Sequence, residues 1–185
     1  MHQQELHGNI RHRTEVRWQR VGRGHHGERA LLIDGEYYSL GGATGSHNNC
    51  LIDTLRQCLN MMANVEAVRL RLMREFDTRC GPLCRESGEN CTATCTKVYR
   101  RNYLTTDHWE AALRLLGEHG EPRRLTFDTS QFCLRVIELT WQDHGVVLGN
   151  PNVQRRLTVA REHGNHFIPV LRYTLDVRNT VWLPW

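Results

Sequence analysis

Apolar residues change their spacing once along this chain of 185 residues, and the change limits the folds that it can form. Within residues 50–76 they recur at three- and four-residue steps, which predicts two helices, one starting at Cys50 and one capped by Asn64. Within residues 134–185, short β-rich segments are separated by Asp, Asn, Gly and Pro, which predicts strands. Helices followed by strands favour an α+β fold in which the first helix packs on a small, mostly antiparallel sheet.

Three shorter patterns add detail to this prediction. Residues 30–40 are expected to form a hairpin, because an Asp-Gly pair between β-rich runs is a strong turn signal. Asp107 and Glu110 predict the capping box of a third helix. Pro169 lacks a backbone N–H, so the strand around it is expected to be an edge or bulged strand.

Composition indicates the domain organisation. Residues 1–28 are polar and rich in His, Arg and Gly, and are predicted to form a loosely packed N-terminal segment without a secretory signal. Residues 29–185 are predicted to form a single domain with a polar, cysteine-rich insert at residues 77–102. With 39% apolar residues the chain can build a core. No run approaches the ~18 apolar residues of a membrane helix, so no membrane partner is expected.

The basic residues are almost all arginine, since Lys97 is the only lysine among 24 basic residues and the net charge is +4. Arginine suits phosphate contacts, so a nucleic-acid partner has to be considered. The arginines are scattered among 20 acidic residues and form no dense basic run. We therefore expect no nucleic-acid partner.

The most informative segment for function is residues 41–49, a Gly- and Asn-rich loop that delivers Cys50 to the first position of a helix. There the helix dipole and the free backbone N–H groups are expected to lower the pKa of the thiol. The same N–H groups can hold an oxyanion during acyl transfer. Cys50 is therefore the candidate nucleophile, and the alternative is a small buried residue that opens the helix.

His166 is the candidate general base, because it follows a Gly-Asn turn and opens a late apolar strand that can face this helix. The alternative for His166 alone is a surface histidine at the end of a strand. Three other histidines are weaker candidates: His47 is expected to shape the loop, and His108 and His163 are expected to be exposed.

Four of the seven cysteines form a cluster in the insert, namely Cys80, Cys84, Cys91 and Cys95. Four thiolates suit a structural zinc ion, but spacings of three, six and three residues are a weak signal for one. Disulfides and unpaired thiols are the alternatives. No cofactor is predicted.

Together these features resemble the ovarian tumour (OTU) family of papain-like cysteine proteases, which are deubiquitinases. In that family an Asp-Gly-Asn-Cys-Leu segment leads into the nucleophile helix, and a histidine followed by an aromatic residue opens a late strand. The matching positions here are Asn49, Cys50, Leu51, His166 and Phe167. The resemblance covers residues 45–64 and 155–173. It implies a papain-like, OTU-like fold with residues 29–185 as the catalytic domain.

Two positions depart from the family pattern. His47 stands where the family usually has an aspartate, and Ile168 stands where it usually has the acid or amide that orients the histidine. Another group should hold the second ring nitrogen of His166. Asp34, at the end of a predicted strand, is our candidate for this orienting acid, with Asn165 as a local alternative.

The resemblance implies a thiol-dependent hydrolase that cuts isopeptide bonds after the C-terminal glycine of ubiquitin or polyubiquitin. Its oxyanion would be held by the loop at Asn48 and Asn49. Glu36 and Asp53 are candidate acids for contacting the arginines of the ubiquitin tail.

Seven cysteines without a signal peptide favour a reducing, cytoplasmic compartment. The scarcity of lysine fits a bacterial effector or toxin domain that is secreted into a host cell and avoids being ubiquitinated itself. A GC-rich genome is the alternative explanation. Two other functions stay open: a papain-like toxin protease or amidase with another substrate, and a non-catalytic, arginine-rich binding module.

Overall fold

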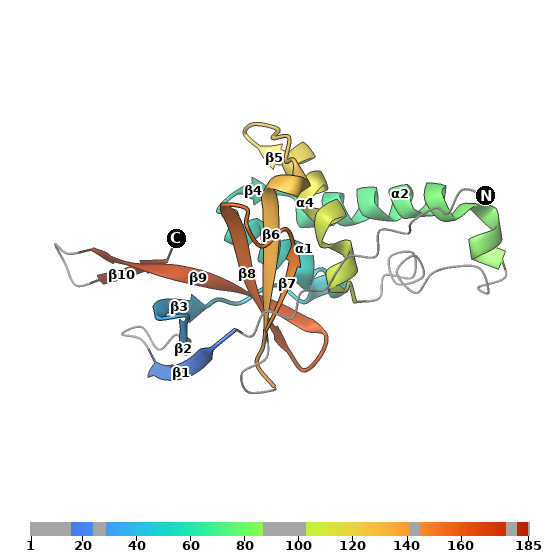
Figure 1. Cartoon of the computed structure of the whole chain (residues 1–185). Coiled ribbons are helices and arrows are strands. Elements are labelled where there is room, and N and C mark those ends of the chain that lie inside the picture. The colour runs from blue at the N-terminus through green and yellow to red at the C-terminus, as the bar shows by residue number, and fades with distance from the viewer. Residues whose placement is uncertain (1–15, 24–28, 87–102, 141–144, 177–180, 185) are drawn as a thin grey trace, which may run out of the picture.

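The computed structural model describes residues 16–23, 29–86, 103–140, 145–176 and 181–184. Within these ranges three α-helices, α1 (Cys50–Cys58), α2 (Val65–Glu86) and α4 (Trp109–Glu118), lie beside one main sheet (Figure 1). The sheet contains β1 (Trp18–Arg23), β2 (Arg29–Ile33), β3 (Glu36–Leu40), β6 (Phe132–Glu138), β7 (Gly145–Gly149), β8 (Arg155–Glu162), β9 (His166–Asp176) and β10 (Val181–Pro184). Two short strands, β4 (Met62–Ala63) and β5 (Gly120–Glu121), pair with each other.

The strand order in the main sheet is β1-β2-β3-β9-β8-β6-β7, and β10 pairs with β9. β6 and β8 are parallel, and the other pairs of described strands are antiparallel. The prediction of an α+β fold with a mostly antiparallel sheet is confirmed. The hairpin predicted for residues 30–40 is also confirmed, with Ile33 opposite Glu36 at its turn.

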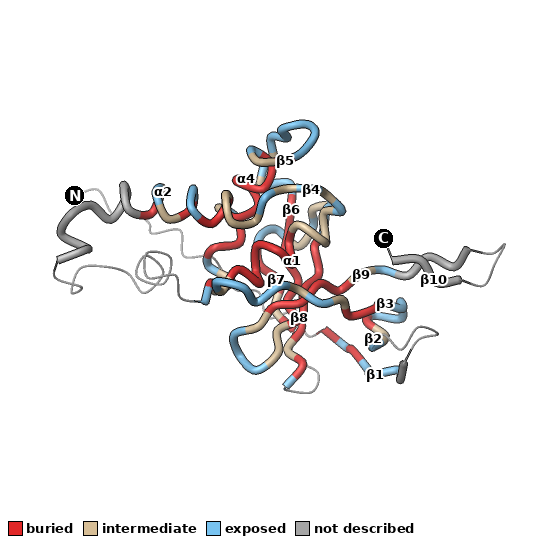
Figure 2. Tube along the Cα trace, turned by 180° about the vertical axis from the view of Figure 1, so that it is seen from behind, coloured by how far each residue is buried: buried red, intermediate tan, exposed pale blue. Residues whose placement is uncertain are grey.

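Each face of the sheet buries its own cluster of side chains. α1 packs against β8 and β9, and α2 and α4 pack against α1. This larger cluster includes Leu51 of α1, Leu134 of β6 and Phe167 of β9. The smaller cluster, on the opposite face, includes Ile137 and Ile168, because successive side chains of a strand alternate between faces. Figure 2 shows that burial is concentrated on α1, α4 and the central strands, so α1 lies in the core of the described fold.

β9 lies between β3 and β8 in the strand order, but the part of it that contains Pro169 pairs with a described strand on one side only, as the edge position predicted from Pro169 requires. β3 ends with Leu40 opposite Val170, and the amide of Gly41 donates to the carbonyl oxygen of Pro169 at 2.9 Å. The missing N–H of Pro169 therefore falls just beyond the end of β3, where the ladder requires no donor.

The boundaries of three elements differ from the predictions. Part of the predicted N-terminal segment belongs to the sheet: β1 pairs with β2, and Trp18 is 5% exposed. Thr105 and His108, rather than Asp107 and Glu110, form the capping box, because a 3-10 turn precedes α4. α2 extends into the predicted insert, whose residues 87–102 lie outside the described ranges. None of the described helices is long and apolar enough to cross a membrane.

Candidate active site

Cys50 occupies the first position of α1, directly after the loop of residues 41–49, and is 1% exposed. Its Sγ donates a hydrogen bond to the carbonyl oxygen of Asn165 at 3.6 Å. One turn further along α1, Thr54 Oγ1 donates to the carbonyl oxygen of Phe167 at 2.9 Å. The two segments that carry the sequence motifs therefore meet in the fold.

The strand order explains why Cys50 and Thr54 of α1 contact residues 165–167. β3 ends opposite Val170, so within the described ranges the first residues of β9 pair with β8 on one side and with no strand on the other. α1 covers this open edge, with Thr54 satisfying a backbone carbonyl that a strand would otherwise bind. α1 is thereby aligned with Asn165 and Phe167, the residues on both sides of His166.

The pKa of the Cys50 thiol is raised above its ordinary value, mainly because the side chain is buried. The backbone N–H groups of Phe167, Leu51 and Cys50 itself lower the pKa, and so does the positive charge of Arg69. Burial outweighs these effects, so the sequence-based expectation of a lowered pKa is wrong in its net direction. In this structure the thiol is protonated near neutral pH and needs a base to become a nucleophile.

His166 directly follows Asn165, whose carbonyl oxygen binds the Cys50 thiol. The imidazole of His166 lies on a defined face of the sheet. Phe167 packs in the helical cluster and Ile168 in the cluster on the opposite face, so strand alternation places His166 on the face of Ile168. Its side chain is half-buried. Among the described residues, the hydrogen bond of the thiol goes to Asn165 and none joins it to an imidazole.

Glu162 is the carboxylate that the topology places next to His166. The two residues are directly opposite in the antiparallel pair of β8 and β9, where Cβ atoms are ~5 Å apart on one face. Glu162 Oε1 pairs with Arg29, and Oε2 accepts no hydrogen bond within the described ranges. Glu162 was not among the candidates predicted from the sequence, which were Asp34 and Asn165. The available signal was the run Glu-His-Gly-Asn-His, in which a three-residue turn sets Glu162 opposite His166.

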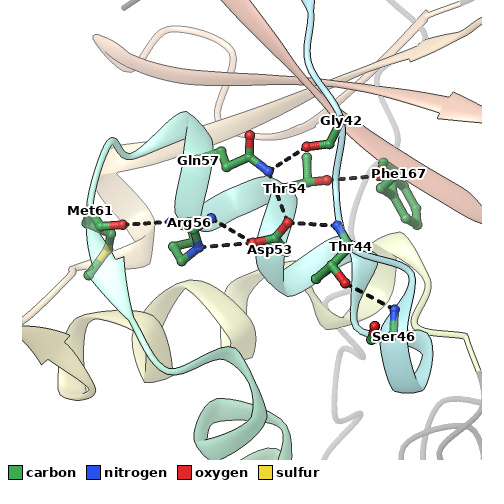
Figure 3. Close-up of polar contacts among 9 residues, drawn as sticks. All are labelled: Gly42, Thr44, Ser46, Asp53, Thr54, Arg56, Gln57, Met61 and Phe167. Carbon is green, nitrogen blue, oxygen red and sulfur yellow. Dashed lines mark hydrogen bonds and ion pairs between the residues drawn. The ribbon is translucent and has the colours of Figure 1, made fainter.

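α1 holds the first half of the loop before Cys50 (Figure 3). Asp53 Oδ2 accepts from the amide of Thr44 at 2.9 Å, and Gln57 Nε2 donates to the carbonyl oxygen of Gly42 at 2.7 Å. Asp53 also binds Arg56 and Gln57 and is 6% exposed. It is therefore committed to the loop, contrary to the expectation that it lines a channel for an arginine-bearing peptide.

α2 holds the second half of the loop. Arg69 Nη1 donates to the carbonyl oxygen of Asn48 at 3.2 Å and to Asn49 Oδ1 at 3.4 Å. Asn49 Nδ2 donates to Glu66 Oε2 at 3.0 Å, and His47 Nδ1 lies 3.8 Å from the same oxygen. His47 thus shapes the loop, as the sequence predicts.

The backbone N–H groups expected to hold an oxyanion are partly engaged. The amide of Asn48 donates to the carbonyl oxygen of Gly45 at 3.0 Å, and that of Asn49 donates to Ser46 at 3.2 Å. These bonds form the 3-10 turn Ser46–Asn48. The first amides of α1, at Cys50 and Leu51, have no acceptor one turn back and lie by the thiol. They are better placed than Asn48 and Asn49 to receive an oxyanion.

Asp34 is not part of this arrangement. Its Oδ2 pairs with Arg135 Nη1 at 3.1 Å, in the turn between β2 and β3. Tyr38 of β3 is opposite Arg172, which is already ~20 Å along β9 from His166, and Asp34 lies beyond Tyr38. The choice of Asp34 as the orienting acid is therefore not supported by the fold, which turns the hairpin tip away from Cys50.

Glu36 also lies at this far end of β9, where it pairs with Arg172. Asp34 and Glu36 line a cavity of about 580 Å³, which neither Cys50 nor His166 contacts. Neither acid is placed to meet a peptide at Cys50.

We expect Asp34→Asn to keep hydrolytic activity within about twofold and to lower the free energy of unfolding by about 1 kcal/mol. The Asp34 side chain is 53% exposed while its partner Arg135 is 5% exposed, so the lost charge weakens a partly screened pair. Asparagine tolerates the left-handed backbone at this position, where φ is 50°. Urea denaturation and a turnover assay check this, and a hundredfold loss of activity with normal stability would place Asp34 in the site after all.

The remaining candidates divide between surface and core. His163 is exposed in the turn between β8 and β9, as expected. His108 is 0% exposed, contrary to expectation, because its Nδ1 accepts from the amide of Thr105 in the capping box. No group of three or more potential metal ligands occurs among the described residues. Two members of the proposed zinc cluster, Cys91 and Cys95, lie outside those residues, and the side chains of Cys80 and Cys84 are likewise undescribed.

Solved structures with a weak overall likeness to this chain were found. An OTU deubiquitinase from Wolbachia pipientis wMel is 18% identical with a TM-score of 0.41, over 73% of this chain and 88% of that one. An OTU deubiquitinase from Wolbachia pipientis wMel bound to ubiquitin gives 17% identity and a TM-score of 0.40, over 73% of this chain and 96% of that one. The viral OTU domain protease from Taggert virus gives 12% identity and a TM-score of 0.38, over 86% and 94%. No protein-family model and no curated protein matches the chain.

Proposed function

We propose that this chain is a cysteine hydrolase of the OTU deubiquitinase type, which cuts isopeptide bonds after the C-terminal glycine of ubiquitin. The observation that carries the proposal is the contact of Cys50, at the start of α1, with Asn165 at the start of β9. This contact joins the Asn-Cys-Leu and His-Phe segments, which lie more than a hundred residues apart in the sequence. If Cys50 only packed in the core, no histidine would be needed directly after its partner Asn165.

The proposed reaction has two stages. His166 takes the proton from Cys50, whose thiolate attacks the carbonyl carbon of the terminal glycine and forms an S–C bond. As the tetrahedral intermediate collapses, the C–N bond to the lysine breaks and His166 gives its proton to the leaving amine. His166 then takes a proton from water, whose oxygen attacks the thioester carbonyl. As the C–S bond breaks, His166 returns this proton to the Cys50 sulfur, and the carboxylic acid of ubiquitin loses its own proton to solvent. The amides of Cys50 and Leu51 stabilise the negative oxygen in both stages.

The raised pKa of Cys50 gives His166 a necessary role in this scheme. A protonated thiol is a poor nucleophile, so the rate depends on a base that removes its proton as the substrate arrives. Strand alternation places the imidazole on the face of Ile168, so this scheme requires its side chain to turn around the open edge of β9 to reach the Cys50 sulfur.

Glu162 is our proposed orienting acid in place of Asp34. It is directly opposite His166, and its Oε2 can accept from the second ring nitrogen. Holding the ring in one tautomer keeps the other nitrogen available to the thiol.

We expect Glu162→Gln to lower kcat by about 10- to 100-fold, with little change in KM, because the ring loses its negatively charged acceptor. The matched control is Arg29→Met, which breaks the ion pair with Glu162 but leaves the carboxylate in place. Steady-state kinetics on a ubiquitin C-terminal amide compares them. Equal losses in both variants would show that the ion pair stabilises the fold and that Glu162 does not act on His166.

The substrate class is tested by incubating the protein with a panel of lysine-linked di-ubiquitins and with a ubiquitin-like protein of different C-terminal sequence. We expect release of mono-ubiquitin from at least one linkage and no cleavage of the ubiquitin-like control. If no ubiquitin bond is cut while Cys50 still reacts with a small thiol reagent, the protein hydrolyses another substrate. The proposal would then fail at its substrate and not at its nucleophile.

A further inference from the structure

Arg69 is a charged residue at the base of the cysteine loop, and it is 0% exposed. It lies in the first half of α2, a helix separate from the one that carries Cys50. Its Nη1 reaches both the carbonyl oxygen of Asn48 and the side-chain oxygen of Asn49, at 3.2 and 3.4 Å. One guanidinium therefore contacts the two residues immediately before the nucleophile.

The side-chain amide of Asn49 is fixed at both of its ends. Its oxygen faces the cation Arg69, and its nitrogen donates to the anion Glu66 at 3.0 Å. Only an amide satisfies both partners, because an aspartate here would place a second carboxylate against Glu66. The charges on α2 thus fix the orientation of Asn49 and, with it, the start of α1.

The loop backbone is held in a conformation that it would not adopt readily by itself. His47 and Asn48 have φ values of 53° and 61°, in the left-handed region that non-glycine residues seldom occupy. Such residues persist where surrounding contacts fix them, and they concentrate at functional sites. The bond from Arg69 to the Asn48 carbonyl is one of these contacts.

If position 69 served only to pack the core, an apolar residue would be expected there. Val65, Leu72 and Phe76 lie on the inward face of α2, and position 69 continues that face at four- and three-residue steps. An apolar side chain would complete the stripe, and replacing buried charges by apolar residues is often neutral or stabilising. A buried arginine on this stripe is therefore better explained by the loop that it contacts than by stability of the core.

We propose that Arg69 is a positioning residue for Cys50, whose guanidinium fixes the loop of residues 45–49 and electrostatically favours the thiolate. The inference rests on the proposed role of Cys50 as the nucleophile. The charge of Arg69 lowers the pKa of Cys50 in opposition to burial, which agrees with the geometry. Both effects can be measured without ubiquitin, so failure of the proposed substrate would leave them testable.

The test compares Arg69→Met, which removes the charge and the donors, with Arg69→Lys, which keeps the charge but puts it in an ammonium group on a shorter side chain. The control is Arg71→Met, because Arg71 is an exposed arginine on the same helix. Circular dichroism and thermal unfolding establish that each variant folds. Alkylation of Cys50 by iodoacetamide is followed against pH by mass spectrometry of the Cys50 peptide, and hydrogen exchange is followed at the amides of residues 45–50.

For Arg69→Met we expect the alkylation midpoint to move up by about one pH unit, with roughly tenfold slower labelling near neutral pH. Arg69→Lys should keep the midpoint of the wild type but exchange the loop amides about tenfold faster, because the shorter lysine side chain lacks the Nη1 group that reaches both loop oxygens. Arg71→Met should match the wild type in both readouts. A folded Arg69→Met with an unchanged midpoint would overturn the proposal. If Arg69→Met does not fold, wild-type exchange in Arg69→Lys would overturn it instead.

Discussion

Cys50→Ala is expected to abolish hydrolysis of ubiquitin conjugates, with a loss in kcat of about 10⁴-fold or more. The mechanism forms its covalent bond at this sulfur, and no other described cysteine lies against the start of β9. Removing the buried Cys50 sulfur from the start of α1 lowers the free energy of unfolding by about 1 kcal/mol, so the variant should remain folded. Near-ultraviolet circular dichroism and a continuous fluorogenic assay measure the two effects separately.

Cys58→Ala is the matched control for this substitution. Cys58 ends the same helix, and its Sγ donates to the carbonyl oxygen of Thr158 at 3.4 Å. Burial raises the pKa of its thiol to about 12, so it is not a nucleophile near neutral pH. The control should keep its activity within a few-fold. Full activity in folded Cys50→Ala, or equal losses in both variants, would show that Cys50 is not the nucleophile.

His166→Gln is expected to lower kcat by about 10²- to 10⁴-fold while KM stays within a few-fold of the wild type. Glutamine keeps a polar side chain at this half-buried position but cannot carry a proton between the thiol and the leaving amine. Because the resting thiol is protonated, the loss should be greatest for substrates with poor leaving groups, such as isopeptides. Steady-state kinetics on an isopeptide and on an activated ester of ubiquitin compare the two cases.

His163→Asn is the matched control for His166→Gln. His163 is exposed, lies three residues earlier in the same turn and has a φ of 50°, which asparagine accommodates. We expect it to behave as the wild type. If His166→Gln retained wild-type turnover, or if His163→Asn lost as much, the base would have to come from another residue.

Local features of the site were predictable from the sequence, because the residues that create them are neighbours. The Gly- and Asn-rich loop, the helix that begins at Cys50 and the cap at Asn64 all depend on short-range chemistry, and Asn64 Oδ1 does accept from the amide of Ala67. Because Cys50 is the first residue of α1, the position of this helix determines where the thiol lies. It does not determine the pKa, which depends on how deeply the rest of the chain buries the sulfur.

Features that depend on strand register were harder to predict. Asp34 was chosen because it ends a predicted strand upstream of Cys50, but β3 pairs with the far half of β9 and places Asp34 away from His166. Glu162 is close to His166 because β8 and β9 form a tight hairpin. Arg69 interrupts the apolar stripe of its helix, and such an interruption could have indicated a buried polar contact. The loop that Arg69 contacts could not be identified from the spacing of residues, because Arg69 lies on α2 and the loop precedes α1.

The central claim, that Cys50 attacks the C-terminus of ubiquitin, is tested most directly by ubiquitin that carries a C-terminal electrophile. Intact mass spectrometry should show one adduct of the protein with one ubiquitin, and peptide mapping should place the bond at Cys50. The adduct should be absent from Cys50→Ala and from denatured protein, and it should persist in Cys58→Ala. Absence of the adduct from folded wild-type protein, while iodoacetamide still labels Cys50, would contradict the claim.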